Sequence, residues 1–128
     1  MTRRESIYLE GFAHRNPVPA ACRIGAHLYS GVLTGRDPES HGMPSSLDEQ
    51  VGNIFTHVRE LMRAAGGSTD DIVKMTVYLT EYRDRTALND EWVAMFPDPA
   101  NRPTRQVMAA QFDGDTLAQA DLVAILAD

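Results

Sequence analysis

The sequence predicts an α+β fold, in which two amphipathic helices cover one face of a mixed β-sheet. The chain has 128 residues, of which 43% are hydrophobic, and this suits one domain over residues 1–128 with one ordinary core. Two stretches carry helical periodicity, and the other apolar stretches are short, β-rich and bounded by turn residues. The expected order is β-β-β-α-β-α-β-β, with too few helices to cover both faces of the sheet.

Three short strands are expected before the first helix, at residues 6–9, 20–24 and 27–33. Gly25-Ala26 separates the second from the third and is typical of a β-hairpin. Residues 35–44 are rich in Gly, Asp, Pro and Ser, so we predict a loop there.

The first helix has clear start and stop signals. Ser46 and Glu49 have the spacing of a capping box. An apolar stripe at helical spacing follows, formed by Leu47, Val51, Ile54, Phe55, Val58, Leu61 and Met62. Gly66-Gly67 should end the helix, because glycine readily adopts the left-handed conformation.

The second half should hold a strand, a helix and two more strands. Residues 70–80 form a β-rich run, and residues 83–96 form a second amphipathic helix that Pro97 stops. The last two strands are expected at residues 105–111 and 117–126, on either side of an Asp-Gly-Asp turn.

The last predicted strand is largely apolar on both sides. Ala120, Leu122 and Ala124 alternate with Asp121 and Val123, so both faces should be buried. A chain of this size has no second helix layer, and subunit association is the simplest way to cover the other face.

Composition excludes several function classes. The net charge of −6 and pI of about 5.1 argue against binding to nucleic acid. Cys22 is the single cysteine, which favours a reducing compartment, and we expect the cytoplasm. No apolar stretch approaches the length of a membrane span, so no membrane partner is expected. The histidines share no ligand spacing, so no metal site is expected.

Arg105 and Asp121 are the candidate catalytic residues. Arg105 stands where a proline-containing loop, Arg102-Pro103-Thr104, meets a β-type segment. A guanidinium group suits bidentate binding of a carboxylate, and an acid such as Asp121 can orient water. The pair suggests hydrolysis of a small organic acid. The alternatives are a solvated surface arginine and an aspartate in a polar patch of a subunit interface.

The element order and several local motifs resemble the RidA/YjgF family of reactive-intermediate deaminases. The matching pieces are Tyr29-Ser30-Gly31, Ala64-Ala65-Gly66-Gly67, the segment Val73–Leu79, Asn89 and Arg102-Pro103-Thr104-Arg105. The resemblance covers nearly the whole chain. It implies a chorismate-mutase-like fold and a homotrimer, in which three sheets form a central barrel and ligand clefts lie between subunits.

The resemblance also implies a reaction. Family members hydrolyse 2-imino acids, or their enamine tautomers, to 2-oxo acids and ammonia without a metal or an organic cofactor. Arg105 would then pair with the substrate carboxylate, and Asp121 would hold the attacking water. Ser30 and Gly31 would line the cleft, together with Asn89, Val107 and Val18.

Three positions depart from the family pattern. The water-positioning acid is usually a glutamate, a cysteine is common where Val107 stands, and an aromatic residue is common at Val18. Two other functions therefore compete with the general deaminase. One is a non-catalytic binder of small carboxylates, and the other is a specialised enamine deaminase of a degradation pathway that takes a bulkier acid. Asn89 and Ser30 could also have structural roles. The Asn89 side chain could cap or hold a loop at the interface, and the Ser30 hydroxyl could satisfy a backbone group.

Overall fold

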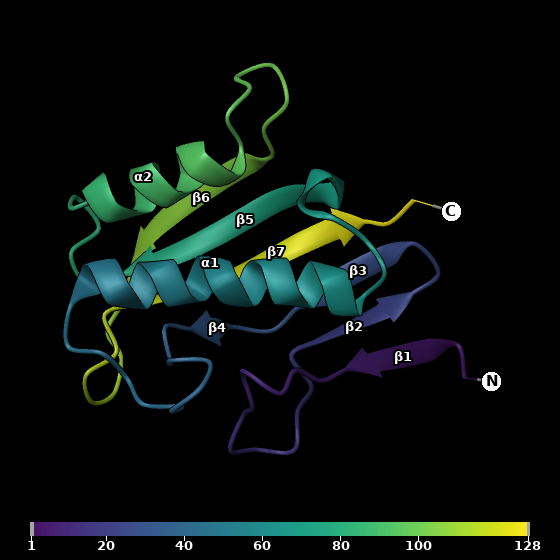
Figure 1. The fold of residues 1–128 in the computed structure, drawn as a ribbon, viewed down its shortest axis with the longest axis horizontal. Coiled ribbons are helices and arrows are strands. Elements are labelled where there is room, and N and C mark those ends of the chain that lie inside the picture. Colours follow the sequence, from purple (N-terminus) through teal and green to yellow (C-terminus); the bar gives the residue numbers. More distant parts are fainter. Residues whose placement is uncertain (1, 128) are drawn as a thin grey trace.

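The computed structural model describes residues 2–127, in which two α-helices pack on one face of a single seven-stranded sheet (Figure 1). The strands lie in the order β1-β2-β3-β7-β5-β6, and the short β4 pairs with β7. Only β5 and β6 are parallel. The elements are β1 (Arg4–Ile7), β2 (Ala21–Ile24), β3 (His27–Ser30), β4 (Leu33–Thr34), α1 (Leu47–Ala64), a 3₁₀ turn (Thr69–Asp71), β5 (Ile72–Leu79), α2 (Thr86–Met95), β6 (Thr104–Ala109) and β7 (Ala118–Ile125). The predicted α+β class is confirmed.

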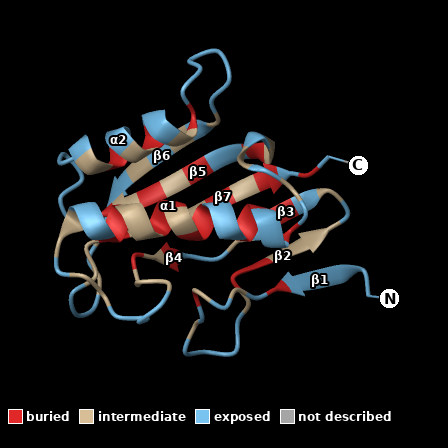
Figure 2. Cartoon of the chain, viewed as in Figure 1, coloured by how far each residue is buried: buried red, intermediate tan, exposed pale blue. Residues whose placement is uncertain are grey.

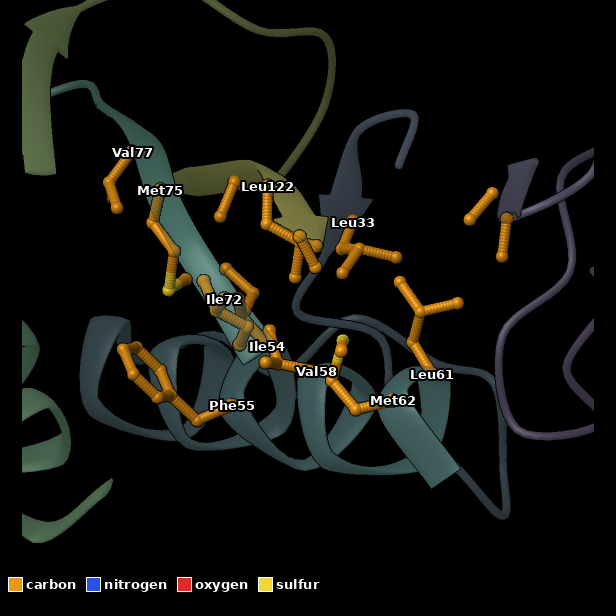
Figure 3. Packing of buried hydrophobic residues seen from close by; sticks show 14 of the residues in the cluster. Leu33, Ile54, Phe55, Val58, Leu61, Met62, Ile72, Met75, Val77 and Leu122 are labelled. Atoms are coloured by element: carbon orange, nitrogen blue, oxygen red, sulfur yellow. The ribbon is translucent and has the colours of Figure 1, made fainter. Parts of the chain in front are cut away.

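The first helix forms as its capping signals predict. The Ser46 Oγ accepts a hydrogen bond from the Glu49 backbone N–H at 3.2 Å, and Gly66 follows the helix with φ of +80°. The apolar stripe of α1 points at the sheet, where Phe55 and Ile54 face Met75 of β5 and Leu122 of β7 (Figure 3). These contacts fix the helix across the middle of the sheet.

The two faces of the sheet differ in burial. Along β7, Ala118, Ala120, Leu122 and Ala124 are at most 1% exposed beneath the helices. The residues between them are only half-buried, so buried and half-buried residues alternate along the strand (Figure 2). Ile125, at its end, is 41% exposed. Within one chain, therefore, one face of β7 is covered, and the other face remains open.

Some predicted boundaries were wrong at the edge of the sheet. The first strand begins at Arg4 rather than at residue 6, because its pairing with β2 starts there. Arg4, Glu5 and Ser6 are all exposed, so no hydrophobic residue marks this start in the sequence. An edge strand with one buried residue carries little hydrophobic pattern of its own, so its ends are hard to predict from sequence.

Two further elements also differ from the prediction. The expected strand 27–33 is interrupted at Gly31-Val32 and divides into β3 and β4. Helix α2 begins at Thr86 rather than at residue 83, because a turn precedes it in which the Arg85 Nε donates to the Tyr82 carbonyl at 2.8 Å. Pairing with other strands decides where β3 and β4 divide, and local hydrogen bonding decides where α2 begins.

Gln50 ties the start of α1 to the turn before β7. Its fully buried amide donates to the carbonyls of Pro44 and Asp115, both at 2.8 Å, and accepts from the Leu117 N–H at 2.8 Å. Gly35, directly after β4, lies against the same residue: a Cβ there would collide with the Gln50 Cα. Only glycine fits this contact between β4 and α1.

We expect Gly35→Ala to destabilise the protein strongly. The added methyl would collide with the backbone of α1, and overpacking of this kind costs about 1–3 kcal/mol or more. Gly52→Ala is the matched control, because a Cβ at Gly52 meets nothing within 4 Å. Alanine there should raise helix stability by about 0.5–1 kcal/mol. Urea denaturation would measure both free energies of unfolding, and equal effects of the two variants would contradict the contact.

His57 should make stability depend on acid pH. It is 1% exposed, its Nε2 lies 2.7 Å from the Arg36 carbonyl oxygen, and burial lowers its pKa. Because the pKa of His57 is lower in the folded state, folding favours the neutral imidazole. The resulting contribution to the free energy of unfolding is fully present above the unfolded pKa of about 6.5 and is lost as the pH falls through the folded pKa.

Denaturant titrations from pH 7 to pH 5 would measure this dependence. One proton contributes a slope of at most about 1.4 kcal/mol per pH unit, and His57→Gln should reduce the slope of the wild type. His27 is exposed, so His27→Gln should leave the slope unchanged. A slope that survives in His57→Gln would assign the acid sensitivity to another group.

Candidate functional site

Arg105 lies on β6, the edge strand of the sheet beneath α2. Its Cζ stands 4.9 Å from the centroid of the Trp92 ring, a cation–π contact. The Nη1 nitrogen is buried and has no hydrogen-bond partner. Within residues 2–127 the one salt bridge joins Arg63 to Glu60, so no carboxylate of this part of the chain pairs with Arg105. The guanidinium therefore has donors in place for an external anion.

The surroundings of Arg105 disfavour its charge. Burial lowers the pKa of Arg105, and the nearby positive charge of Arg85 lowers it further. A half-buried cation without a counter-ion is unfavourable, and a carboxylate bound here would offset both effects. Charge-assisted hydrogen bonds of this kind are about twice as strong as neutral ones.

Asn89 and Val107 lie at the same edge of the molecule. Asn89 and Trp92 of α2 follow the N-cap residue Arg85 at helical spacing, so Asn89 shares the side that faces Arg105. Asn89 is exposed. Val107 is two residues along β6 from Arg105, therefore on the same face of the strand, and packs against the core. We call these residues of α2 and β6 the arginine edge.

Asp121 lies on the open face of the sheet, opposite Thr76 of β5. Burial raises its pKa, and the neighbouring Tyr78 hydroxyl and Lys74 ammonium partly offset that rise. The negative charge of Asp121 in turn raises the pKa of Tyr78. A carboxyl group whose pKa is raised toward neutrality is a better general base than an ordinary aspartate.

The sheet of one chain separates Arg105 from Asp121. Arg105 pairs with Met75, and Met75 pairs with Leu122, so these three lie on the helix face. Asp121 is the next residue along β7 and therefore points to the other face. Within a single chain, therefore, the two candidate catalytic residues do not face one pocket, and neither the strand order nor the register that separates them is visible in the sequence.

Ser30 and Gly31 lie at the break between β3 and β4. The Ser30 Oγ donates to the Gly31 carbonyl and accepts from the Leu122 N–H, both at 2.8 Å. The Ser30 hydroxyl thus takes the place of a backbone hydrogen bond of the sheet where the strand is interrupted. This is the structural role, as a partner of backbone groups, that the sequence left open as the alternative to ligand binding. Gly31 is exposed, and Val18, on the loop between β1 and β2, is 47% exposed.

A cavity of about 960 Å³ opens at Gln119, two residues along β7 from Asp121 on the same face. It lies between the loop 12–16, β4 and the turn that precedes β7, and Tyr78 and Gln119 of the open face contribute to its wall. Tyr78 therefore connects the cavity with Asp121. Sequence reasoning missed Tyr78, because alternation along β5 reveals the face only after the register with β7 is known.

The described residues contain no group of three or more His, Cys, Asp or Glu side chains arranged to hold a metal ion. Across residues 2–127, neither α-helix has the length and apolar character needed to cross a membrane.

Comparisons with known proteins agree with this architecture. The family model described as endoribonuclease L-PSP matches residues 13–114. The Schizosaccharomyces pombe protein mmf2, mitochondrial, is 34% identical over 73% of this chain and 72% of its own length. A 2-iminobutanoate/2-iminopropanoate deaminase from Capra hircus is 30% identical over 62% of this chain and 59% of its own length.

Solved structures share the whole fold. RidA from an Antarctic Psychrobacter superposes with a TM-score of 0.87 at 24% identity, covering 95% of this chain and 99% of that one. Escherichia coli TdcF with bound serine gives a TM-score of 0.86 at 21% identity, over 96% and 99% of the two chains. Because the family model spans most of the chain and a relative above 30% identity covers more than two thirds of it, this protein belongs to the Rid/YjgF family, also described as endoribonuclease L-PSP.

Proposed function

We propose that the protein hydrolyses reactive 2-imino acids, or their enamine tautomers, to 2-oxo acids and ammonia. One observation carries this proposal: Arg105 holds a half-buried guanidinium with an unpartnered N–H and no carboxylate counter-ion within residues 2–127. The name of the Capra hircus relative, an iminobutanoate and iminopropanoate deaminase, supports the same substrate class. Each of these imines carries a carboxylate suited to a bidentate arginine.

In this proposal Arg105 binds the substrate carboxylate and Asp121 positions the water. Asp121 accepts a proton as the water oxygen bonds to the imine carbon, and the electrons of the C=N double bond move to nitrogen, which takes up a proton. The hydroxyl group then passes its proton to the nitrogen, so that the C–N bond breaks, ammonia leaves and the 2-oxo group forms. The raised pKa of Asp121 suits this general-base role.

The two groups lie on opposite faces of one sheet, so the proposed site needs a second copy of the chain. We propose a homotrimer in which the arginine edge of one subunit meets the open face of the next. The half-buried open side of β7 supports such contacts. Light scattering should give three times 14.2 kDa. A monomer at micromolar concentration would contradict both the assembly and the shared site.

Two alternative functions have specific support. Aspartate is one methylene shorter than the family's usual glutamate, and misplacement of about 1 Å can cost about a hundredfold in rate. This favours a non-catalytic binder of small carboxylates. The large cavity beside Tyr78 instead favours a specialised enamine deaminase for bulkier acids. The single cysteine supports a reducing compartment such as the cytoplasm.

A coupled assay with freshly generated 2-imino acids tests the proposal. An amino acid oxidase would form each imine in place, and the released ammonia or 2-oxo acid would be followed against uncatalysed hydrolysis. Acceleration that Arg105→Ala abolishes is the expected result. If the protein binds 2-oxo acids but accelerates the hydrolysis of no imine, whatever the size of its side chain, the deaminase proposal fails and the non-catalytic binder of small carboxylates is favoured.

A further inference from the structure

A second, smaller cavity of about 170 Å³ adjoins the large one and has a basic wall. The two cavities share Phe12, Ala13, Arg15 and Arg36, and His41 completes the ionisable lining of the smaller one. No carboxylate lines this side pocket. Two guanidinium groups and an imidazole around one small space suit an anion such as a carboxylate or a phosphate.

The loop of the side pocket is held in place without using its arginines as counter-ions. The Asp37 carboxylate accepts the backbone N–H groups of Glu39 and Ser40 at 2.8 and 2.9 Å. The His41 N–H donates to the Asp37 carbonyl at 2.9 Å, and His41 adopts a φ of 64°. Asp37, the acid that follows Arg36 in the sequence, is therefore engaged with its own loop.

Both arginines retain donors for a ligand. Arg36 gives one hydrogen bond, from Nη1 to the His41 carbonyl at 3.2 Å, and Arg15 has no hydrogen bond within residues 2–127. The acids that line the large cavity, Asp113 and Asp115, do not line the side pocket.

The large cavity runs from Tyr78 and Gln119 on the open face to these arginines. Tyr78 forms part of its wall and lies beside Asp121. Phe12 and Phe112 supply apolar surface, and the buried hydroxyl of Thr34, which has no hydrogen-bond partner, supplies a polar contact. A ligand with its reacting carbon near Asp121 would extend its side chain past Tyr78 into this space.

We propose that the preferred substrates are 2-imino acids whose side chain ends in a second anionic group, bound by Arg15 and Arg36. This inference rests on the proposed function for the reacting end of the molecule. The chemistry of the distal end is that of a carboxylate or a phosphate, and one or two charge-assisted hydrogen bonds there would favour the anionic ligand by roughly tenfold or more.

Calorimetry with two product analogues of equal chain length tests the distal site. The expected result is that 2-oxoadipate binds the wild type at least about tenfold more tightly than 2-oxohexanoate. Arg15→Gln and Arg36→Gln should each remove most of this preference and leave the affinity for 2-oxohexanoate within about twofold. Arg59→Gln is the matched control, because Arg59 is exposed on α1 and lines neither cavity.

The outcomes separate this inference from the deaminase proposal. Equal affinity of the wild type for the two acids, or equal behaviour of the Arg15, Arg36 and Arg59 variants, would overturn it. Inorganic phosphate that competes with 2-oxoadipate, but not with 2-oxohexanoate, would support the site and assign it to phosphate-bearing side chains as well. If the preference holds but no imine is turned over, the distal site stands and the enzymatic proposal fails.

Discussion

Replacing Arg105 with alanine should abolish binding of small 2-oxo acids such as pyruvate and 2-oxobutanoate, while the fold persists. Each charge-assisted hydrogen bond to a carboxylate contributes about 1.5–3 kcal/mol, so losing two lowers affinity by at least about a hundredfold. The guanidinium packs on Trp92 and has no partner for Nη1, so its removal breaks no ion pair within residues 2–127. Calorimetry would measure the affinity, and circular dichroism would report the fold.

Two further variants sharpen the test of Arg105. Arg105→Lys should also fail, because an ammonium group cannot offer the planar pair of donors that a carboxylate accepts. Arg59→Ala removes an exposed arginine from α1 and should bind normally. Unchanged binding of 2-oxo acids by Arg105→Ala would place the carboxylate site elsewhere in the protein.

Replacing Asp121 with asparagine should lower the rate of imine hydrolysis by about 10²–10⁴ and leave carboxylate affinity intact. The amide keeps the shape of the side chain and removes the charge that accepts a proton. In the wild type the raised pKa of Asp121 means that the rate should increase as the pH rises through that value, since only the carboxylate acts as a base. The variant should lose this dependence.

Other results would assign Asp121 a different role. A weaker oligomer or a lower melting temperature, with no change in rate constant, would make the residue structural. Asp48→Asn is the control, because Asp48 is exposed in the first turn of α1 and lines neither cavity. Asp121→Glu restores the family's usual acid, and a faster reaction with small imines would indicate a site adjusted for larger substrates. An unchanged rate would show that another group positions the water.

The sequence by itself determined the features that depend on neighbouring residues. The Ser46 cap and the spacing of the apolar stripe give α1 almost to the residue, because capping and helical periodicity are local. The motif around Arg105, together with the order of the elements, was enough to identify the family. The chemistry of a guanidinium group made a carboxylate the expected ligand.

Only the tertiary structure decided which side chains lie together. Strand β5 stands between β6 and β7, and its two registers put Arg105 and Asp121 on opposite faces. Arg15 and Arg36 meet at one pocket although a hairpin separates them in sequence. Gly35 must be glycine because Gln50 lies against it. Strand order, register and packing are set by contacts between distant segments, and no local pattern encodes which partner each strand selects.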